Sequence, residues 1–393
     1  MAKASNQLLA SRSRRRGAPS KSNIQRKVSG ALYGGAIGDG MGAPVEGWEA
    51  NAIGKKFERW DFRYFIPSRA KEAKGNGRIT DDTLMVEALI RSYQRKGGHL
   101  DAYDFRDFLL PEIVETIVWL PERQRNMPIF DRLNAVEKYA WYRLSVFGAE
   151  PRVAGIGNAI NCAVAMFIWP VGAINATDCE SAYNEAAAFA AAESSSYAVE
   201  AAAVLAAAFA AAFSIDASVD SVLNSATRLA RDGTASAINA VLQATDPQDD
   251  RDTFIAQTRV AFIPFDHKQS HVPLESGGRM PDNNQPSSRL SLEEVPIALA
   301  ALKWGNGDFL RTLSAAVSYG RDCDSIAAMA CGLLGAITGE QAIPSPLRVA
   351  SDKANRRDWR AIAARFTQTI KVVSRADKFK LNRRLLATVG KSL

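Results

Sequence analysis

The chain has 393 residues, of which 47% are hydrophobic and 23% are charged. This is an ordinary soluble composition, and the chain is long enough for one large domain or two small ones. Residues 1–27 contain eight basic residues and no acid, and residues 345–393 contain thirteen basic residues and three acids. Subtracting these charges of +8 and +10 from the net charge of +7 leaves −11 for residues 28–344. The basic ends can bind nucleic acid, anionic lipid or an acidic protein, or they can simply be solvated.

The four cysteines are Cys162, Cys179, Cys323 and Cys331, and none forms a CxxC pair. This spacing gives no sign of a zinc or dithiol motif, and it favours a reducing compartment over a disulfide-linked scaffold. The basic start is not followed by the apolar run that a signal peptide has. We therefore expect a cytoplasmic protein.

The N-terminal third begins with a basic segment and continues into a predicted helix. Residues 1–25 show no apolar periodicity, so we predict disorder there and treat 1–27 as an N-terminal extension. Glycines then recur every four residues from Gly30 to Gly42. A glycine stripe on a helix usually permits close backbone approach to a neighbour. Residues 54–79 are predicted to be irregular.

A helix is predicted from Thr80, and prolines divide residues 101–149 into two or three further short helices before a loop over 151–161. Residues 182–213 are dominated by alanine. A membrane span is one interpretation, but glutamates at 185, 193 and 200 interrupt the run. Two tightly packed helices are the favoured interpretation.

The C-terminal third contains a long surface loop over residues 264–292, which is rich in Pro, Gly, Ser and Asn. Helices are predicted over Leu292–Trp304, over Phe309–Val317 and after Ser325, and residues 373–393 are treated as a basic tail. Strand signals are poor throughout the chain. The pattern predicts one large all-α domain without internal repeats.

Two short acidic segments begin predicted helices: residues 80–83 (TDDT) and residues 322–325 (DCDS). Asp, Ser and Thr commonly cap helices, but paired acids exceed what capping needs. If the two helix starts met, four carboxylates would converge and repel one another unless cations neutralised them. Ligands that are all oxygen favour Mg²⁺, Mn²⁺ or Ca²⁺ over zinc.

Three segments resemble motifs of the ADP-ribosylglycohydrolase family. Residues 34–46 (GGAIGDGMGAPVE) look like its GxxxGDxxGxxxE motif, residues 80–83 like its TDDT motif, and residues 320–327 (GRDCDSIA) like its G-(G/R)-D-x-D-(T/S)-x-A motif. Their order also matches, and the resemblance covers residues 28–372. It implies an all-α orthogonal bundle with a two-metal centre, usually two Mg²⁺ ions, with Mn²⁺ as an alternative.

The resemblance also implies roles for individual residues. The implied metal ligands are Thr80, Asp81, Asp82, Asp322, Asp324 and Ser325. Catalysis is assigned to Glu46, Asp81 and Asp324, with Glu46 at the mouth as a ligand or a water-positioning carboxylate, while Asp39 has a supporting role. Cleavage at the anomeric carbon would pass through an oxocarbenium-like state, with metals orienting the ribose and a water.

Substrate contacts are less specific. Gly155, Gly157 and Asn158 resemble a loop that the family places near the distal ribose and phosphates, but an ordinary tight loop explains them equally well. Tyr197 can stack on the adenine in a neighbourhood where many members have a histidine, although such a tyrosine is more often in a core. Phe167 stands where the family has arginine, which leaves the acceptor preference open.

For the histidines and for two further glutamates, the sequence predicts no part in the chemistry. His99 is predicted to be exposed, and His267 and His271 to lie in the long loop. Glu293 and Glu294 are interpreted as solvated or capping acids.

The resemblance implies a magnesium-dependent hydrolase that removes ADP-ribose from protein arginine or serine. A hydrolase of ADP-ribosylated nucleic acid or of a small molecule is an alternative, and the basic ends favour nucleic acid. A binding protein that blocks an ADP-ribosyltransferase with its N-terminal arm is another. No membrane association is predicted.

Overall fold

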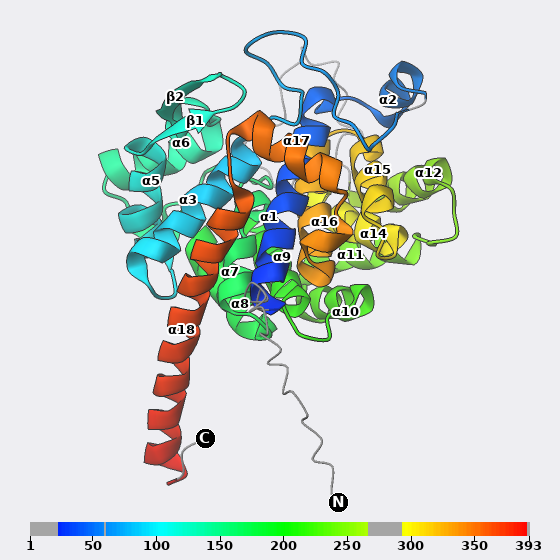
Figure 1. Cartoon of the computed structure of the whole chain (residues 1–393). Coiled ribbons are helices and arrows are strands. Elements are labelled where there is room, and N and C mark those ends of the chain that lie inside the picture. The colour runs from blue at the N-terminus through cyan, green and yellow to red at the C-terminus, as the bar shows by residue number, and fades with distance from the viewer. Residues whose placement is uncertain (1–22, 59, 266–292, 391–393) are drawn as a thin grey trace, which may run out of the picture.

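The computed structural model describes residues 23–58, 60–265 and 293–390, and helices from both ends of the chain meet at its centre (Figure 1). Helix α1 (Asn23–Gly42) lies beside α16 (Cys323–Thr338), and this is the most extensive contact between two elements of the described chain. Every residue of α16 from Cys323 to Ala336 is buried. The pair therefore forms the core around which the other helices pack.

The remaining helices surround this pair and confirm the predicted all-α fold class. They are α2 (Ala50–Lys56), α3 (Asp81–Lys96), α4 (Ala102–Asp104), α5 (Leu110–Val114), α6 (Ala135–Trp141), α7 (Trp169–Ile174), α8 (Cys179–Ala190), α9 (Tyr197–Ala212), α10 (Val219–Leu229), α11 (Asp232–Gln243), α12 (Arg251–Phe262), α14 (Glu294–Gly305), α15 (Phe309–Tyr319), α17 (Ser345–Asn355) and α18 (Trp359–Thr388). Short 3-10 and π turns extend several of them.

The helical body also contains a small β-hairpin that the sequence pattern did not predict. Strands β1 (Ile117–Leu120) and β2 (Arg125–Pro128) pair antiparallel, within a region predicted as short helices. Each strand has only four residues, which is too short for alternation between polar and apolar residues to be recognised. The flanking prolines mark the turn and the end of the hairpin rather than helix boundaries.

The glycine stripe on α1 permits the close approach that the sequence predicted. A Cβ atom added at Gly30, Gly34 or Gly38 would lie 2.0, 2.1 or 2.2 Å from a backbone oxygen of α16. Any larger residue would force the two helices apart. The same packing continues at Gly42, whose added Cβ would lie 2.5 Å from the Cα atom of Asp324. The end of α1 is thereby held against the start of α16.

The alanine-rich region forms two packed helices, α8 and α9, as predicted, and all residues of α9 from Ala201 to Ala212 are buried. Small side chains allow this helix to pack tightly on all sides. Within the described ranges, no helix combines the length and apolarity that crossing a membrane requires.

The two basic ends of the chain have more helical structure than their predicted boundaries imply. Helix α1 begins at Asn23, so residues 23–27 belong to the helical body rather than to the extension. Lys27 is only 4% exposed and donates to the carbonyl oxygens of Ala212, Ala336 and Ile337 at 2.9–3.1 Å. It is buried because the last turns of α9 and α16 present carbonyl groups that attract a cation. The disorder predicted for residues 1–22 lies outside the described residues.

At the other end, α18 continues to Thr388 and extends away from the body (Figure 1), so most of the predicted basic tail is helical. His99 is half-buried rather than exposed, because its ring contacts Glu185 at 2.5 Å and Asp377 of α18 at 3.0 Å. The hydrogen bond to Glu185 is the main reason why the pKa of His99 rises to about 9. The loop containing His267 and His271 lies outside the described residues.

Candidate metal centre at two helix N-termini

The start of α3 is held by a buried carboxylate of α1. Asp39 is fully buried, and its oxygens accept hydrogen bonds from the Thr80 backbone N–H at 3.0 Å and from the Thr83 backbone N–H at 3.2 Å. The Thr83 hydroxyl also donates to Asp39, at 2.6 Å. Asp39 therefore supplies the acceptors that the first turn of α3 lacks, and this orients Asp81 and Asp82. Burial raises the pKa of Asp39 to about 7.

The start of α16 is shaped by a tight backbone turn. Gly320 and Arg321 have φ angles of 78° and 58°, a left-handed conformation that suits glycine. The Arg321 N–H donates to the Trp48 carbonyl at 2.6 Å, and the Gly47 N–H donates to the Arg321 carbonyl at 2.6 Å. These two hydrogen bonds hold the turn against residues 47–48, in the segment that follows α1. Asp322 follows as the first, half-exposed residue of the helix start.

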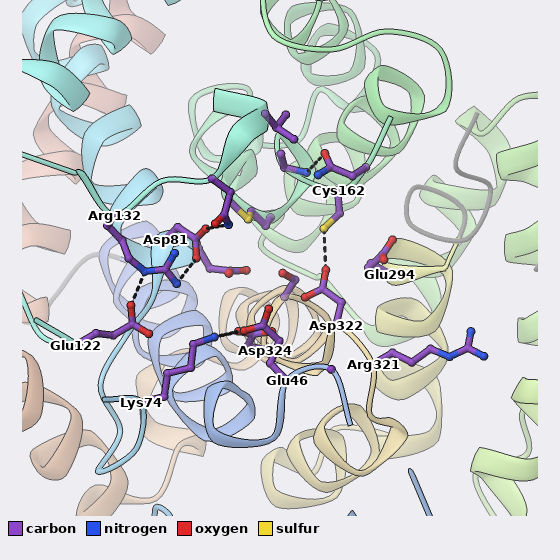
Figure 2. A pocket seen from close by; sticks show the side chains of 18 of the residues that line it. Glu46, Lys74, Asp81, Glu122, Arg132, Cys162, Glu294, Arg321, Asp322 and Asp324 are labelled. Atoms are coloured by element: carbon purple, nitrogen blue, oxygen red, sulfur yellow. Dashed lines mark hydrogen bonds and ion pairs between the residues drawn. The ribbon is translucent and has the colours of Figure 1, made fainter. Parts of the chain in front are cut away.

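The two acidic helix starts meet in one cleft of about 650 Å³, as the sequence analysis expected (Figure 2). One carboxylate oxygen from each of Asp39, Asp82 and Asp324 can be chosen so that all three lie within 4.8 Å of one another. The same holds for Glu46, Asp322 and Asp324. Eleven carboxylates and four cationic side chains line the cleft among the described residues.

This arrangement fits a bound cation. Asp82 Oδ1 and Asp324 Oδ1 are buried and have no hydrogen-bond partner in the described structure. Burial raises the pKa of Asp82 well above its usual range, and burial together with the Asp324 charge raises that of Asp322 to about 7. Buried carboxylates that repel one another are stabilised by a divalent ion with oxygen ligands. The donor set therefore suits Mg²⁺ or Mn²⁺.

The remaining predicted ligands lie beside these carboxylates. The Thr80 side chain is fully buried, and its Oγ1 donates to Asp82 Oδ2 at 3.2 Å. Ser325, in the first turn of α16, is 3% exposed and lines the cleft. Glu46 lies at the mouth and is exposed, because the chain leaves the short turn Ala43–Val45 in an extended conformation there.

Two cationic side chains that the sequence analysis missed contact the acids. The Lys74 ammonium forms an ion pair with Glu46, and its Nζ lies 3.7 Å from Asp324 Oδ2. Arg132 lies 2.9 Å from Asp81 Oδ1 and also pairs with Glu122. These cations offset part of the repulsion in the cleft. No local pattern marks them, because both come from segments without helical periodicity.

The wall formed by α14 and the loop before α7 was also missed. Glu293 and Glu294 are 2% and 1% exposed and line the cleft, so their interpretation as solvated acids is wrong. The alternative of capping acids fits better in position, because Glu293 is the N-cap residue of α14, although its side chain makes no capping hydrogen bond. Glu293 accepts from the Tyr319 hydroxyl at 2.7 Å and from Arg321 at 2.6 Å, which compensates for its burial. Cys162 also lines the cleft, close to Glu294, and its thiol donates to Asp322 Oδ2 at 3.0 Å.

The structure does not bring the predicted substrate-binding residues to the cleft wall. Gly155 packs against the backbone of Ser194, and Gly157 adopts a φ of 91° beside Tyr139. The Asn158 amide donates to the carbonyl oxygens of Val136 and Glu193. The next residues of this loop, from Asn161 onwards, do line the cleft. Tyr197 packs against Gly233 instead.

A model of the ADP-ribosylglycohydrolase family matches residues 20–376. The chain belongs to this family. It is 26% identical over 342 residues to the "Uncharacterized protein YegU" of Escherichia coli (strain K12), which covers 86% of this chain and 95% of that protein. Among solved structures, an "ADP-ribosylglycohydrolase-related protein complex" covers 88% of this chain and 99% of its own, at 21% identity and a TM-score of 0.49.

Membership in the ADP-ribosylglycohydrolase family makes this chain a glycosyl hydrolase. The family is metal-dependent, and the acidic clusters described above are candidate metal sites in this member. The matched range includes α1, both acidic helix starts and most of α18.

Proposed function

We propose that this ADP-ribosylglycohydrolase uses two Mg²⁺ ions to cleave the glycosidic bond between ADP-ribose and a modified acceptor, with protein arginine or serine as the acceptor. The observation that carries the proposal is the convergence of the two acidic helix starts, with buried and unpartnered oxygens on Asp82 and Asp324. A cluster of repelling buried carboxylates costs stability unless it binds cations, and the family membership supplies the reaction class.

The chain offers ligands from both helix starts. Those that would hold the ions are Thr80, Asp81, Asp82, Asp322, Asp324 and Ser325. When bound, the ions would orient the ribose hydroxyls and increase the acidity of a water. Arg132 and Asn134 contact the two oxygens of Asp81 at 2.9 and 3.3 Å. These contacts fix the direction in which Asp81 faces the cleft.

Glu46 is the residue that we propose accepts the water proton. Its carboxylate lies at the mouth of the cleft, and one of its oxygens lies within 4.8 Å of ligand atoms of both Asp322 and Asp324. A carboxylate in this position can accept a proton from an attacking water or stabilise the positive charge that develops on the ribose. Lys74 pairs with Glu46 and restrains its rotamer.

The substrate's diphosphate requires positive charge in a cleft that is mainly acidic. Arg123 is exposed in the turn between β1 and β2 and lines the cleft. We propose that it contacts the diphosphate, because a guanidinium can bind phosphate oxygens in a bidentate manner. The cleft volume of about 650 Å³ suits a ligand of this size.

The direct test is release of free ADP-ribose from arginine-linked and serine-linked proteins and from ADP-ribosylated nucleic acid. Glu46→Gln should lower kcat by about 100-fold or more with little change in KM, which is the effect of losing a general base. Glu72→Gln is the matched control, since Glu72 is exposed at the same cleft but belongs to none of the carboxylate groups that can hold an ion. An unchanged kcat in Glu46→Gln would remove this residue from the mechanism.

The same panel separates the alternatives. Release from nucleic acid alone would favour the polynucleotide substrate, which the basic exposed end of α18 can attract. Blocking of an ADP-ribosyltransferase by the N-terminal arm involves residues 1–27, of which 1–22 lie outside the described residues. The four cysteines are all free, which agrees with the proposed cytoplasmic location.

A further inference from the structure

The last part of α18 projects from the body and carries charge of one sign. Val373 is the last buried residue of this helix, and Figure 1 shows its free end extending away from the other helices. Residues 378–390 contain no acid and four basic residues, all of them exposed: Lys378, Lys380, Arg383 and Arg384. The helix end is therefore a concentrated positive charge with solvent around it.

This charge costs stability as long as nothing opposes it. Lys380 lies three and four positions before Arg383 and Arg384, so like charges are neighbours on the helix surface and repel one another. The single acid within α18 is Asp377, which is shared between His99 at 3.0 Å and Lys380 at 3.8 Å. A short helix segment without tertiary packing is also only marginally stable in water. A bound polyanion would relieve this repulsion, so charge complementarity favours such an occupant.

The helix end lies on the side of the body opposite the cleft. Helix α3 begins with Asp81, which lines the cleft, and its 16 residues rise about 24 Å before the helix ends at Lys96. His99 follows this far end and contacts Asp377 where α18 leaves the body. The free end of α18 therefore continues away from the cleft.

The other basic end of the chain attaches on the same side. Helix α1 runs from Asn23 to Gly42, and Gly42 packs against the start of α16 at the cleft. The start of α1 therefore lies at the far side, as Figure 1 shows. Residues 1–22, which precede it, contain six basic residues and no acid. Both basic ends thus join the body opposite the acidic cleft.

We propose that the basic end of α18, residues 378–390, is a nucleic-acid-binding surface that contacts the phosphate backbone. A polynucleotide bound there leaves the cleft open to solvent. The surface therefore anchors the protein to nucleic acid and takes no part in cleaving the glycosidic bond. This inference goes beyond the proposed function and depends neither on the metal centre nor on hydrolysis.

The distribution of apolar side chains favours nucleic acid over a membrane surface. A helix that lies on a bilayer has its apolar and basic residues on opposite faces. Here Phe379 and Leu381 are 63% and 44% exposed, but they are two positions apart and so point to nearly opposite sides of the helix. The Arg383 guanidinium lies over the Phe379 ring, 6.0 Å from its centroid. Positive charge on every side suits a polyanion, whose phosphates supply most of the binding energy.

The experiment measures binding to a fluorescein-labelled DNA duplex of about 20 base pairs at several salt concentrations between about 50 and 200 mM NaCl. Full-length protein is added and the fluorescence anisotropy is followed. EDTA is present throughout, so that metal ions in the cleft cannot bridge to phosphate. Wild type should bind the duplex. The logarithm of its affinity should fall against the logarithm of salt concentration with a slope of about −3.6 or steeper, the value for four phosphate contacts.

The decisive variant removes the four charges of the helix end by combining Lys378→Gln, Lys380→Gln, Arg383→Gln and Arg384→Gln. Its slope should be shallower by at least about 2, and its affinity at about 100 mM NaCl should fall at least tenfold. Glutamine preserves helix propensity, so α18 should remain helical.

The matched control removes four exposed basic residues of α2 and of the loop before α3, by combining Lys55→Gln, Lys56→Gln, Arg69→Gln and Lys71→Gln. Its net charge equals that of the α18 variant, so a loss caused by overall charge alone would appear in both. The control should keep the wild-type slope. Circular dichroism checks that each protein is folded.

Absence of binding by folded wild type, or equal slopes in the α18 variant and the control, would overturn the proposal. If the fourfold α18 variant does not fold, Arg383→Gln combined with Arg384→Gln takes its place, and an unchanged slope there would overturn the proposal. Co-sedimentation with vesicles of phosphatidylserine and phosphatidylcholine tests the membrane alternative. Tighter binding to these vesicles than to the duplex would overturn the proposal in favour of a membrane surface.

Discussion

The role of Asp39 can be tested by removing its carboxylate. Asp39→Ala would leave the backbone N–H groups of Thr80 and Thr83, and the Thr83 hydroxyl, without their acceptor in the core. Both Asp39 and Thr80 are fully buried, so bulk solvent does not reach these donors in the wild-type fold. The first turn of α3 would then shift, and Asp81 and Asp82 would shift with it.

The magnitude follows from the number of unsatisfied donors. Two buried backbone donors without an acceptor cost about 1–3 kcal/mol each. Part of this cost is offset, because burial raises the pKa of Asp39 to about 7, so its charged form is itself destabilised in the fold. We expect a net loss of about 3 kcal/mol in the free energy of unfolding. Mg²⁺ affinity should fall at least tenfold, as when a supporting residue of a metal site is lost.

The matched control is Asp308→Ala. Asp308 caps α15 and accepts from the Arg311 N–H at 2.9 Å, but it does not line the cleft. Its loss should cost about 1 kcal/mol, as for an ordinary helix cap, and leave Mg²⁺ binding unchanged. Urea unfolding and calorimetric Mg²⁺ titration measure both quantities. Equal stability losses in the two variants, with wild-type Mg²⁺ affinity in Asp39→Ala, would refute the positioning role.

Three further predictions concern packing, pH and metal removal. Gly34→Ala places a Cβ atom 2.1 Å from the Cys331 carbonyl oxygen and should lower stability to urea by about 2 kcal/mol, whereas Gly35→Ala, whose Cβ meets only an oxygen at 3.6 Å, should not. The pKa of His99 rises from 6.5 to about 9, mainly through its hydrogen bond with Glu185. The stability from this pair is therefore full below pH 6.5 and lost as the pH rises towards 9. The urea-unfolding free energy of wild type should fall over this range by about 1 kcal/mol more than that of His99→Gln, and parallel pH profiles would contradict the assignment. Mg²⁺ at about 100 times its Kd should stabilise metal-free protein by about 2.7 kcal/mol, visible as a higher Tm that EDTA reverses; an unchanged Tm would argue against binding to the folded state.

Features that depend on local sequence were predictable. The glycine stripe of α1 indicates close helix–helix packing, because only glycine lets two helix backbones approach so closely. The acidic helix starts are recognisable because their composition exceeds what a helix cap needs, and their meeting was implied by the family resemblance. The all-α class followed from helical periodicity and from poor strand signals.

Features that depend on contacts between distant segments were not predictable. Cys162 and Asp322 are separated by 160 positions, and no periodicity relates the segments of Lys74 or Arg132 to the acids that they contact. Glu293 and Glu294 resembled ordinary surface acids, since charge at a helix start is usually solvated. The predicted loop at Gly155 failed to reach the cleft because its backbone packs against Ser194 instead.

A metal centre at the two helix starts is best tested by release of ADP-ribose from an ADP-ribosylated protein by wild type and by Asp324→Asn, each with Mg²⁺ and with EDTA. Wild type should release ADP-ribose only with Mg²⁺. The variant should lose at least a hundredfold in rate, because it lacks a charged ligand whose Oδ1 has no hydrogen-bond partner in the described structure. Equal release in EDTA, or full activity in Asp324→Asn, would contradict a metal centre at the two helix starts.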